Sequence, residues 1–277
     1  MHRKCSGRHE VKVMSGRGLL TIRVGKNTLS FTTQDPTNLE EPIVYEPYLM
    51  KSGISMAANL REAFKETTTV RSTAKAQVLL DAKVLMMPLD YFQESNLEDY
   101  YFHSFPHDKQ LSVTFNVLPD LNAVAVFAIN KDVRLVLRDN VPGALAVHLM
   151  TPVWHYLHKR SFTGHRKKLF GYFHDNQLEI CSFLQNRFKF CNTFDVTQCS
   201  DALYFLLYVW RQLNLQPEHD EIHLVGNIPE REWIIDELKR YIQNVYVITP
   251  TAEFNRAPAT AFDDMPFDLM TILTKGR

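Results

Sequence analysis

Three β-type runs open the patterned part of the sequence, and a helix-type run follows them. Apolar positions alternate with polar ones, or gather in short β-branched stretches, over Leu19–Val24, Thr28–Gln34 and Ile43–Tyr48. These runs predict three strands joined by turns. In the stretch 56–64, apolar residues recur at i, i+4, i+7 and i+8, which is the spacing of one helix face. A fourth strand is predicted over Gln77–Asp81.

The same order of patterns returns in the second half of the chain. Three predicted strands, a buried helix and a fourth strand cover Leu169–His174, Gln177–Phe183, Phe188–Phe194, the stretch from Ser200, and Ile222–Val225. The first strand and the fourth start 57 residues apart in one half (Leu19 to Ala76) and 54 apart in the other (Lys168 to Ile222). Three antiparallel strands followed by helix-linked strands define the ribonuclease H-like unit. The predicted fold is therefore α/β (mixed α+β), with two tandem ribonuclease H-like domains in an actin-like ATPase arrangement.

The remaining patterns fill the gap between these units and set their boundaries. Between them we predict strands at Val84–Met87, Leu111–Val117, Ala123–Ile129 and Arg134–Leu137, a helix over Pro88–Phe102, and helical sequence over Gly143–Lys159. After them come a helix from Pro229 and a strand at Val245–Ile248. The predicted domains are a disordered basic tail (1–18), a first ribonuclease H-like domain (19–160), a polar junction (161–168) and a second domain (169–277).

Composition narrows the class of protein further. Lys and Arg number 31 and Asp and Glu number 31, so the formal net charge is zero and no overall field attracts nucleic acid. No stretch reaches the roughly 18 apolar residues of a membrane span. The basic start has no apolar segment typical of a secretory signal. Four cysteines at irregular spacing do not form a disulfide framework. We expect a cytoplasmic protein.

Glycine is scarce, with 10 residues in 277. A backbone wraps closely around phosphate only where Cβ is absent. No two glycines of the patterned region are close enough to build a Walker A loop, a dinucleotide fingerprint or a kinase glycine loop. Those three nucleotide-binding classes are therefore excluded.

Several segments resemble a known family. The strongest are Phe188–Leu215 (FKFCNTFDVTQCSDALYFLLYVWRQLNL), Glu221–Ile228 (EIHLVGNI) and Met265–Leu273 (MPFDLMTIL). Looser matches are LSFTTQD from Leu29, the VLMMP block from Val84, and His148 followed by TPVWHYL. Together they are similar to an uncharacterised bacterial family of unknown function with an actin-like ATPase fold. The resemblance implies a fold and brings no established activity.

Actin-like ATPases hold nucleotide with two phosphate-binding turns and a glycine pair near adenosine. The first turn here retains Gly25 and Lys26, but Arg23 stands about where a metal-binding carboxylate is needed. The second turn, Phe173–Gln177, has no glycine, and we interpret Asp175 as a turn residue. The third element keeps one glycine of two, in Gly226–Asn227. We therefore expect a vestigial nucleotide cleft made of Gly25, Lys26, Gly226 and Asn227, without catalytic or metal-ligating residues.

The favoured interpretation is a catalytically inactive actin-like protein that acts as a scaffold or interaction module with an unknown protein partner and needs no cofactor. One alternative is a divergent ATPase or small-molecule kinase that uses ATP and Mg²⁺. A second is nucleic-acid binding through the basic tail and the junction cluster Lys159, Arg160, Arg166, Lys167 and Lys168. A ribonuclease H-type nuclease is disfavoured, because neither first strand contains a carboxylate.

Two further groups of residues are candidate sites. His148, His155 and His158 could share one helix face, but no carboxylate or cysteine nearby completes a metal site, so we expect interface or partly buried histidines. Cys181 and Cys191 would oppose each other across a hairpin, and we expect two free thiols. The sequence does not indicate an oligomeric state.

Overall fold

The computed structural model describes residues 18–35, 42–72, 75–255 and 257–274. The predicted basic tail therefore lies outside the described residues, except for Gly18. The strands are β1 Leu19–Val24, β2 Leu29–Gln34, β3 Val44–Tyr48, β4 Lys75–Leu80, β5 Val84–Pro88, β6 Leu111–Leu118, β7 Ala123–Asn130, β8 Leu145–His148, β9 Lys168–His174, β10 Gln177–Leu184, β11 Arg187–Asp195, β12 Glu221–Gly226 and β13 Asn244–Val247. The α-helices are α1 Met56–Glu66, α2 Leu97–Ser104, α3 Lys131–Asn140, α4 Thr151–Ser161, α5 Cys199–Gln212, α6 Arg231–Lys239, α7 Pro250–Glu253 and α8 Phe267–Leu273.

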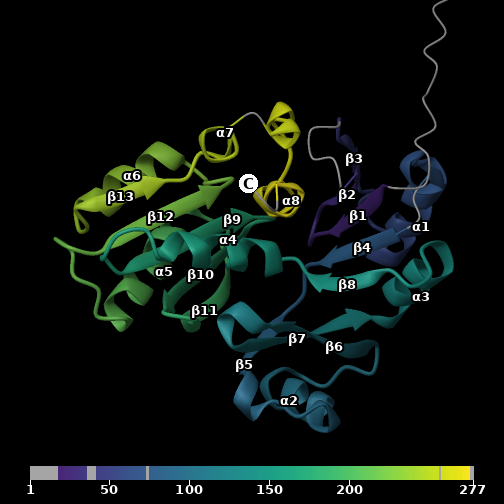
Figure 1. The fold of residues 1–277 in the computed structure, drawn as a ribbon, viewed down its shortest axis with the longest axis horizontal. Helices are drawn as coiled ribbons and strands as arrows, with labels where there is room; N and C mark the ends of the chain where they lie inside the picture. Colours follow the sequence, from purple (N-terminus) through teal and green to yellow (C-terminus); the bar gives the residue numbers. More distant parts are fainter. Residues whose placement is uncertain (1–17, 36–41, 73–74, 256, 275–277) are drawn as a thin grey trace, which may run out of the picture.

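Two five-stranded sheets with matching strand orders form the frame of the molecule (Figure 1). Their orders are β3-β2-β1-β4-β8 and β11-β10-β9-β12-β13. In each sheet the first three strands of the unit pair antiparallel, and the two helix-linked strands pair parallel. This arrangement confirms the predicted repeat of two ribonuclease H-like domains.

The helices and sheets stack in five layers. Helices α1 and α3 cover the outer face of the first sheet, and α5 and α6 cover the outer face of the second. Helices α4 and α8 pack on each other between the two sheets, where Figure 1 shows α8 at the centre of the molecule. Apolar residues of α8 contact both sides: Leu269 lies in a cluster with Leu79 of the first sheet, and Phe267 lies in one with Tyr172 of the second.

Side-chain alternation decides which residues face this central space. On β1, Leu20, Ile22 and Val24 pack against the outer helices, so Arg23 must point to the opposite, inward face. On β9, Leu169 and Phe173 pack outward, so His174 also points inward. A strongly polar residue therefore stands at the inward carboxyl end of the first strand of each domain.

An inserted subdomain lies between β4 and β8. It is the three-stranded sheet β5-β7-β6 with α2 packed against it, at the bottom of Figure 1. Of the helix predicted over Pro88–Phe102, the part from Leu97 is α2, which continues to Ser104, and two short 3₁₀ turns precede it at Leu89–Tyr91 and Glu94–Asn96.

Two predictions in the same region are wrong. The stretch Arg134–Leu137 is helical within α3, because Asn130 caps the helix by accepting hydrogen bonds from the backbone N–H of Asp132 (2.9 Å) and Val133 (3.4 Å). The start of the predicted Gly143–Lys159 helix is instead strand β8, which pairs in parallel with β4. In both places a short apolar run carries no periodicity that separates strand from helix.

Candidate functional site between the two sheets

Arg23 is the centre of the space between the sheets. Its side chain is 2% exposed, and its Nε and Nη2 donate hydrogen bonds to the two carboxylate oxygens of Asp268 at 2.8 and 2.9 Å. Asp268 lies at the start of α8, is fully buried, and also accepts a 2.8 Å hydrogen bond from the hydroxyl of Tyr172. Burial disfavours the charged guanidinium, yet Asp268 outweighs burial and raises the pKa of Arg23 above its usual value. A paired, bidentate geometry of this kind holds a buried cation charged.

The same guanidinium joins the two β-turns that occupy the positions of the phosphate-binding turns in actin-like ATPases. Its Nη2 lies 3.1 Å from Oδ2 of Asp175, in the β9–β10 turn, and its Nη1 bonds to Thr28. Thr28 donates a 2.9 Å hydrogen bond to Oδ1 of Asp175. A Cβ added to Gly25 would lie 2.6 Å from Oδ2 of Asp175, so the two turns are in direct contact. Asp175 does sit in a turn, with φ of +46°, but it also bonds across the domains.

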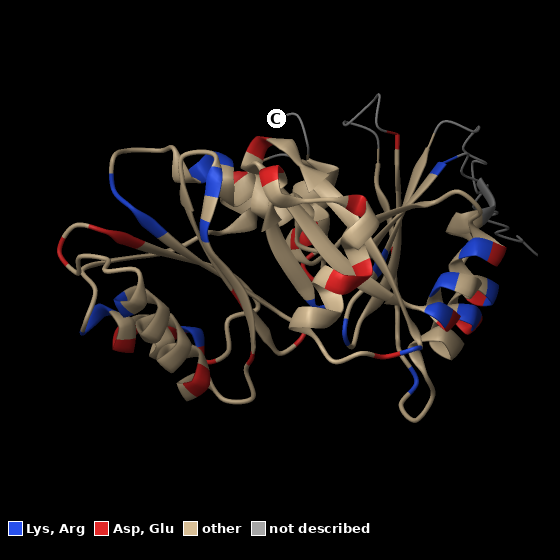
Figure 2. Cartoon of the chain, turned by 90° about the horizontal axis from the view of Figure 1, so that it is seen from below, with Lys and Arg blue, Asp and Glu red and all other residues tan. Residues whose placement is uncertain are grey.

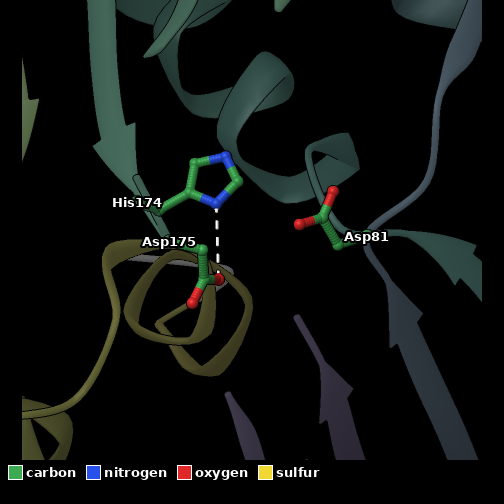
Figure 3. Close-up of side chains that lie close together, drawn as sticks. All are labelled: Asp81, His174 and Asp175. Carbon is green, nitrogen blue, oxygen red and sulfur yellow. Dashed lines mark ion pairs between the residues drawn. The ribbon is translucent and has the colours of Figure 1, made fainter. Parts of the chain in front are cut away.

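A second group of charges adjoins this ion pair (Figure 3). Nδ1 of His174 lies 3.6 Å from Asp175, and Nε2 lies 3.8 Å from Glu179. Burial lowers the pKa of His174, but the two carboxylates outweigh burial and raise it to about 10. Burial raises the pKa of Asp81, just after β4, to about 6. Burial also acts to raise the pKa of Asp175, but His174 and Arg23 prevail and lower it to about 2.

The four residues predicted for the vestigial cleft lie at the edges of this network. Gly25 is in the turn that contacts Asp175, and Lys26 points to the solvent-exposed carboxylate of Asp195 at 2.6 Å. Gly226 ends β12 at φ +94°, packed against the backbone of Phe173. The backbone N–H of Asn227 donates to the Phe173 carbonyl at 3.0 Å. The structure therefore sets Gly25 and Gly226 on either side of the end of β9.

A cavity of about 140 Å³ lies beside Asn227. His174, Asp175 and Gln177 line it together with the start of the segment that leads into α5. Pockets for drug-sized ligands usually measure about 300–1,000 Å³. This cavity is therefore smaller than a usual small-molecule pocket.

The basic cluster of the junction is largely neutralised by carboxylates. Arg160 lies 2.6 Å from Glu253, while Arg166 and Lys168 lie 3.8 and 3.7 Å from Glu221. Lys168, moreover, is buried. Figure 2 shows basic and acidic segments interspersed along the chain, most visibly on the helices at the right of the view. No basic face typical of nucleic-acid binding follows from these described residues.

The candidate histidines and cysteines are held by contacts within the protein. His148 belongs to β8 and not to a helix, and its ring accepts or donates to the Ala82 carbonyl at 2.9 Å while it stacks on Trp154. His158 is buried against the Gln185 carbonyl. Cys181 and Cys191 are directly opposite each other on β10 and β11, and both are free thiols.

Sequence analysis missed the two carboxylates that matter most at this centre. Asp268 lies 245 residues from Arg23 and belongs to a segment that we interpreted only as part of the family resemblance. Asp81 was included in the fourth predicted strand without a role. For Asp81 the available signal was a charged residue directly after an apolar strand, at the point where the carboxyl ends of parallel strands meet.

Two tandem ribonuclease H-like domains around a central cleft define the class of actin-like ATPase folds. Within that class, the chain belongs to the family described as "Protein of unknown function (DUF3822)", which matches residues 14–245. No protein with a curated functional description matches the sequence.

Several solved structures are similar to this chain. A Bacteroides thetaiotaomicron VPI-5482 protein "with actin-like ATPase fold and unknown function" is 27% identical, with a TM-score of 0.81, over 94% of this chain and 96% of that chain. A chain of the "PilM-PilN type IV pilus biogenesis complex" is 12% identical, with a TM-score of 0.51, over 92% and 94%. The cytoplasmic domain of EpsL from Vibrio cholerae is 9% identical, with a TM-score of 0.45, over 76% and 83%.

The fold class implies a nucleotide with Mg²⁺, and the residues present do not fit that group. The two turns that would flank the phosphates touch each other, and Arg23 joins them through a buried ion pair. Separately, none of the helices within the described residues is long and apolar enough to span a bilayer.

Proposed function

We propose that this protein is a catalytically silent member of the actin-like fold class that acts by binding another protein. The observation that carries the proposal is the buried ion pair between Arg23 and Asp268, extended to Asp175. These side chains occupy the place between the domains where the phosphates of a nucleotide would lie. They belong to β1, to α8 and to the β9–β10 turn, so both domains contribute to closing the cleft.

The energetics favour a cleft that stays closed. Phosphoryl transfer depends on metal-bridged charge neutralisation around the phosphates. Here the basic group aimed at that position is already neutralised by two carboxylates of the protein. A nucleotide would have to break a bidentate Arg–carboxylate pair and leave Asp268 buried without its cation, and removing one partner of such a pair costs about 3–5 kcal/mol.

Protein contacts are favoured by exposed aromatic side chains on the second domain. On α5, Tyr204 is 61% exposed and Tyr208 48%, and the two rings stack with centroids 5.9 Å apart. On the neighbouring helix α6, Trp233 is 39% exposed. Tyr and Trp are enriched in protein–protein interfaces, because they supply a large rigid area with a polar end. A similar fold occurs in a chain of the PilM–PilN complex, which is a likeness of fold alone.

The proposal is tested by two measurements on the same preparation. Phosphate release from ATP in the presence of Mg²⁺ should equal the buffer rate. The tagged protein should capture a discrete partner from lysate of the native cell, and Tyr204→Ser/Tyr208→Ser should lose it while Lys189→Ser, an exposed substitution elsewhere on this domain, keeps it. ATP turnover that disappears in Lys26→Met would contradict the proposal, as would capture that is the same in both surface variants.

A further inference from the structure

Three possible metal ligands from both domains converge beside the central ion pair. Asp81 follows β4 of the first domain, whereas His174 and Asp175 are at the β9–β10 turn of the second. One ligand atom from each residue lies within 4.8 Å of the other two. Figure 3 shows the imidazole nitrogen that faces Asp175, and the Asp81 carboxylate on the same side of the ring.

His174 has no hydrogen-bonded partner in this position. The residue is 6% exposed, and neither ring nitrogen makes a hydrogen bond among the described residues. Its nearest carboxylates are at 3.6 and 3.8 Å, which is too long for a hydrogen bond. Asp81 likewise has one buried carboxylate oxygen that lacks a partner among these residues. Buried polar atoms are nearly always paired, so two residues with such atoms, whose possible ligand atoms lie within 4.8 Å of each other, indicate a ligand.

We propose that Asp81, His174 and Asp175 bind a divalent first-row metal ion, with Zn²⁺ or Mn²⁺ as the fitting class. His174 supplies Nδ1, and each aspartate supplies one carboxylate oxygen. One imidazole with two carboxylates suits these ions, whereas Ca²⁺ takes six to eight oxygen ligands. Three protein ligands leave the remaining coordination positions to water. The site requires no nucleotide and is independent of the ion that the fold class uses with its phosphates.

Glu179 completes the arrangement as a positioning residue. Histidines that bind metals usually direct their second nitrogen to a carboxylate, which fixes the tautomer and the orientation of the ring. Nε2 of His174 faces Oε1 of Glu179, and the hydroxyl of Thr193 holds that oxygen with a 2.7 Å hydrogen bond. The Glu179 carboxylate is buried, and the His174 imidazole is the one basic group within 4 Å of it among the described residues.

The local charge leaves a place for a dication. Four buried or half-buried carboxylates (Asp81, Asp175, Glu179 and Asp268) surround two basic groups, the Arg23 guanidinium and the His174 imidazole. A metal ion bound at Nδ1 would take the place of a proton on that imidazole, so the carboxylates still outnumber the cations. Arg23 and Thr28 use part of the lone-pair capacity of Asp175. A carboxylate offers about four lone-pair sites, so Asp175 can serve Arg23 and a metal together.

The consequence is a metal clamp between the domains. Asp81 moves with the first domain, and His174 and Asp175 move with the second, so a bound ion adds a second fixed link beside the pair of Arg23 with Asp268. A ligand that binds the folded state alone raises the melting temperature in a concentration-dependent way. This inference goes beyond the proposed function, because a scaffold with a closed cleft is possible with or without the ion.

The test uses the full chain after treatment with EDTA and gel filtration. Titration with ZnCl₂ or MnCl₂ alone, followed by calorimetry, should give one ion per chain and a saturable rise in melting temperature. His174→Gln and Asp81→Asn should each weaken binding at least tenfold. His219→Gln, which removes an exposed histidine remote from the cluster, should bind as the wild type does.

Two outcomes would overturn the inference. One is binding that is equally strong in His174→Gln, in Asp81→Asn and in the wild type, which would assign the ion to other residues. The other is no stoichiometric binding of either ion at 1 mM. If His174→Gln fails to fold, the partly exposed Asp81→Asn variant decides the question, with folding checked by circular dichroism. The absorption spectrum of the Co²⁺-loaded protein gives an independent readout, and it should change in Asp81→Asn.

Discussion

Replacing Arg23 by Met tests the buried ion pair that closes the cleft. Methionine keeps the length of the side chain and removes the charge. The change leaves the fully buried carboxylate of Asp268 with Tyr172 as its remaining hydrogen-bond donor, and it removes the 3.1 Å contact to Asp175. Removing one partner of a buried ion pair costs about 3–5 kcal/mol of unfolding free energy. Domains usually have only about 5–15 kcal/mol of unfolding free energy, so the loss should be large.

Urea unfolding followed by circular dichroism measures the effect through the transition midpoint. Lys26→Met is the matched control, because it removes another cation close to Arg23 in the chain. Lys26 pairs with Asp195, and both side chains are exposed to solvent (46% for Lys26 and 70% for Asp195). Exposed pairs contribute about 0–1 kcal/mol. The double variant Arg23→Met/Asp268→Asn should recover part of the loss, because it removes the unpaired charge. A cost for Arg23→Met below about 1 kcal/mol, equal to that of the control, would refute the reasoning.

Three other predictions concern the backbone and the thiols. Gly226→Ala should lower the unfolding free energy more than Gly53→Ala. Both glycines have positive φ, but only at Gly226 would an added Cβ overlap the Phe173 carbonyl. Equal losses of the two variants in urea unfolding would contradict this prediction. Asn130→Ala should cost about 0.5–2 kcal/mol through loss of the α3 cap, whereas Asn140→Ala at the far end of the helix should cost less in the same assay. Burial raises the pKa of Cys181 and of Cys191 well above the usual value. Both should therefore react with a thiol reagent only after unfolding, and failure to react in urea without reductant would indicate a disulfide.

Much of the fold could be predicted because it is encoded in local periodicity. The alternation over Leu19–Val24 and Leu169–His174 sets both the strands and the face on which Arg23 and His174 lie. The wrong predictions fall in short apolar runs, where contacts with distant parts of the chain decide between strand and helix. Leu145–His148 becomes a strand because β4 provides a pairing edge and Asn116 bonds to Ala146 and His148 across the gap.

The candidate site was harder to predict, because its partners are far apart in the chain. The sequence of the first turn draws attention to Gly25 and to Arg23, and the structure places both beside Asp175. Nothing local connects Arg23 with Asp268, 245 residues away, or Asp81 with His174. Those contacts arise only when two sheets are stacked around α4 and α8, so a single sequence shows the charges without showing which of them meet.

The proposed function rests on a cleft that the protein's own side chains close to nucleotide. Isothermal titration of the EDTA-treated full chain with ATP in excess Mg²⁺ measures whether the cleft is closed. We expect no saturable heat up to several millimolar nucleotide, and no rise in melting temperature beyond that given by Mg²⁺ alone. Saturable binding of one ATP per chain that Lys26→Met weakens would show instead that the cleft accepts nucleotide.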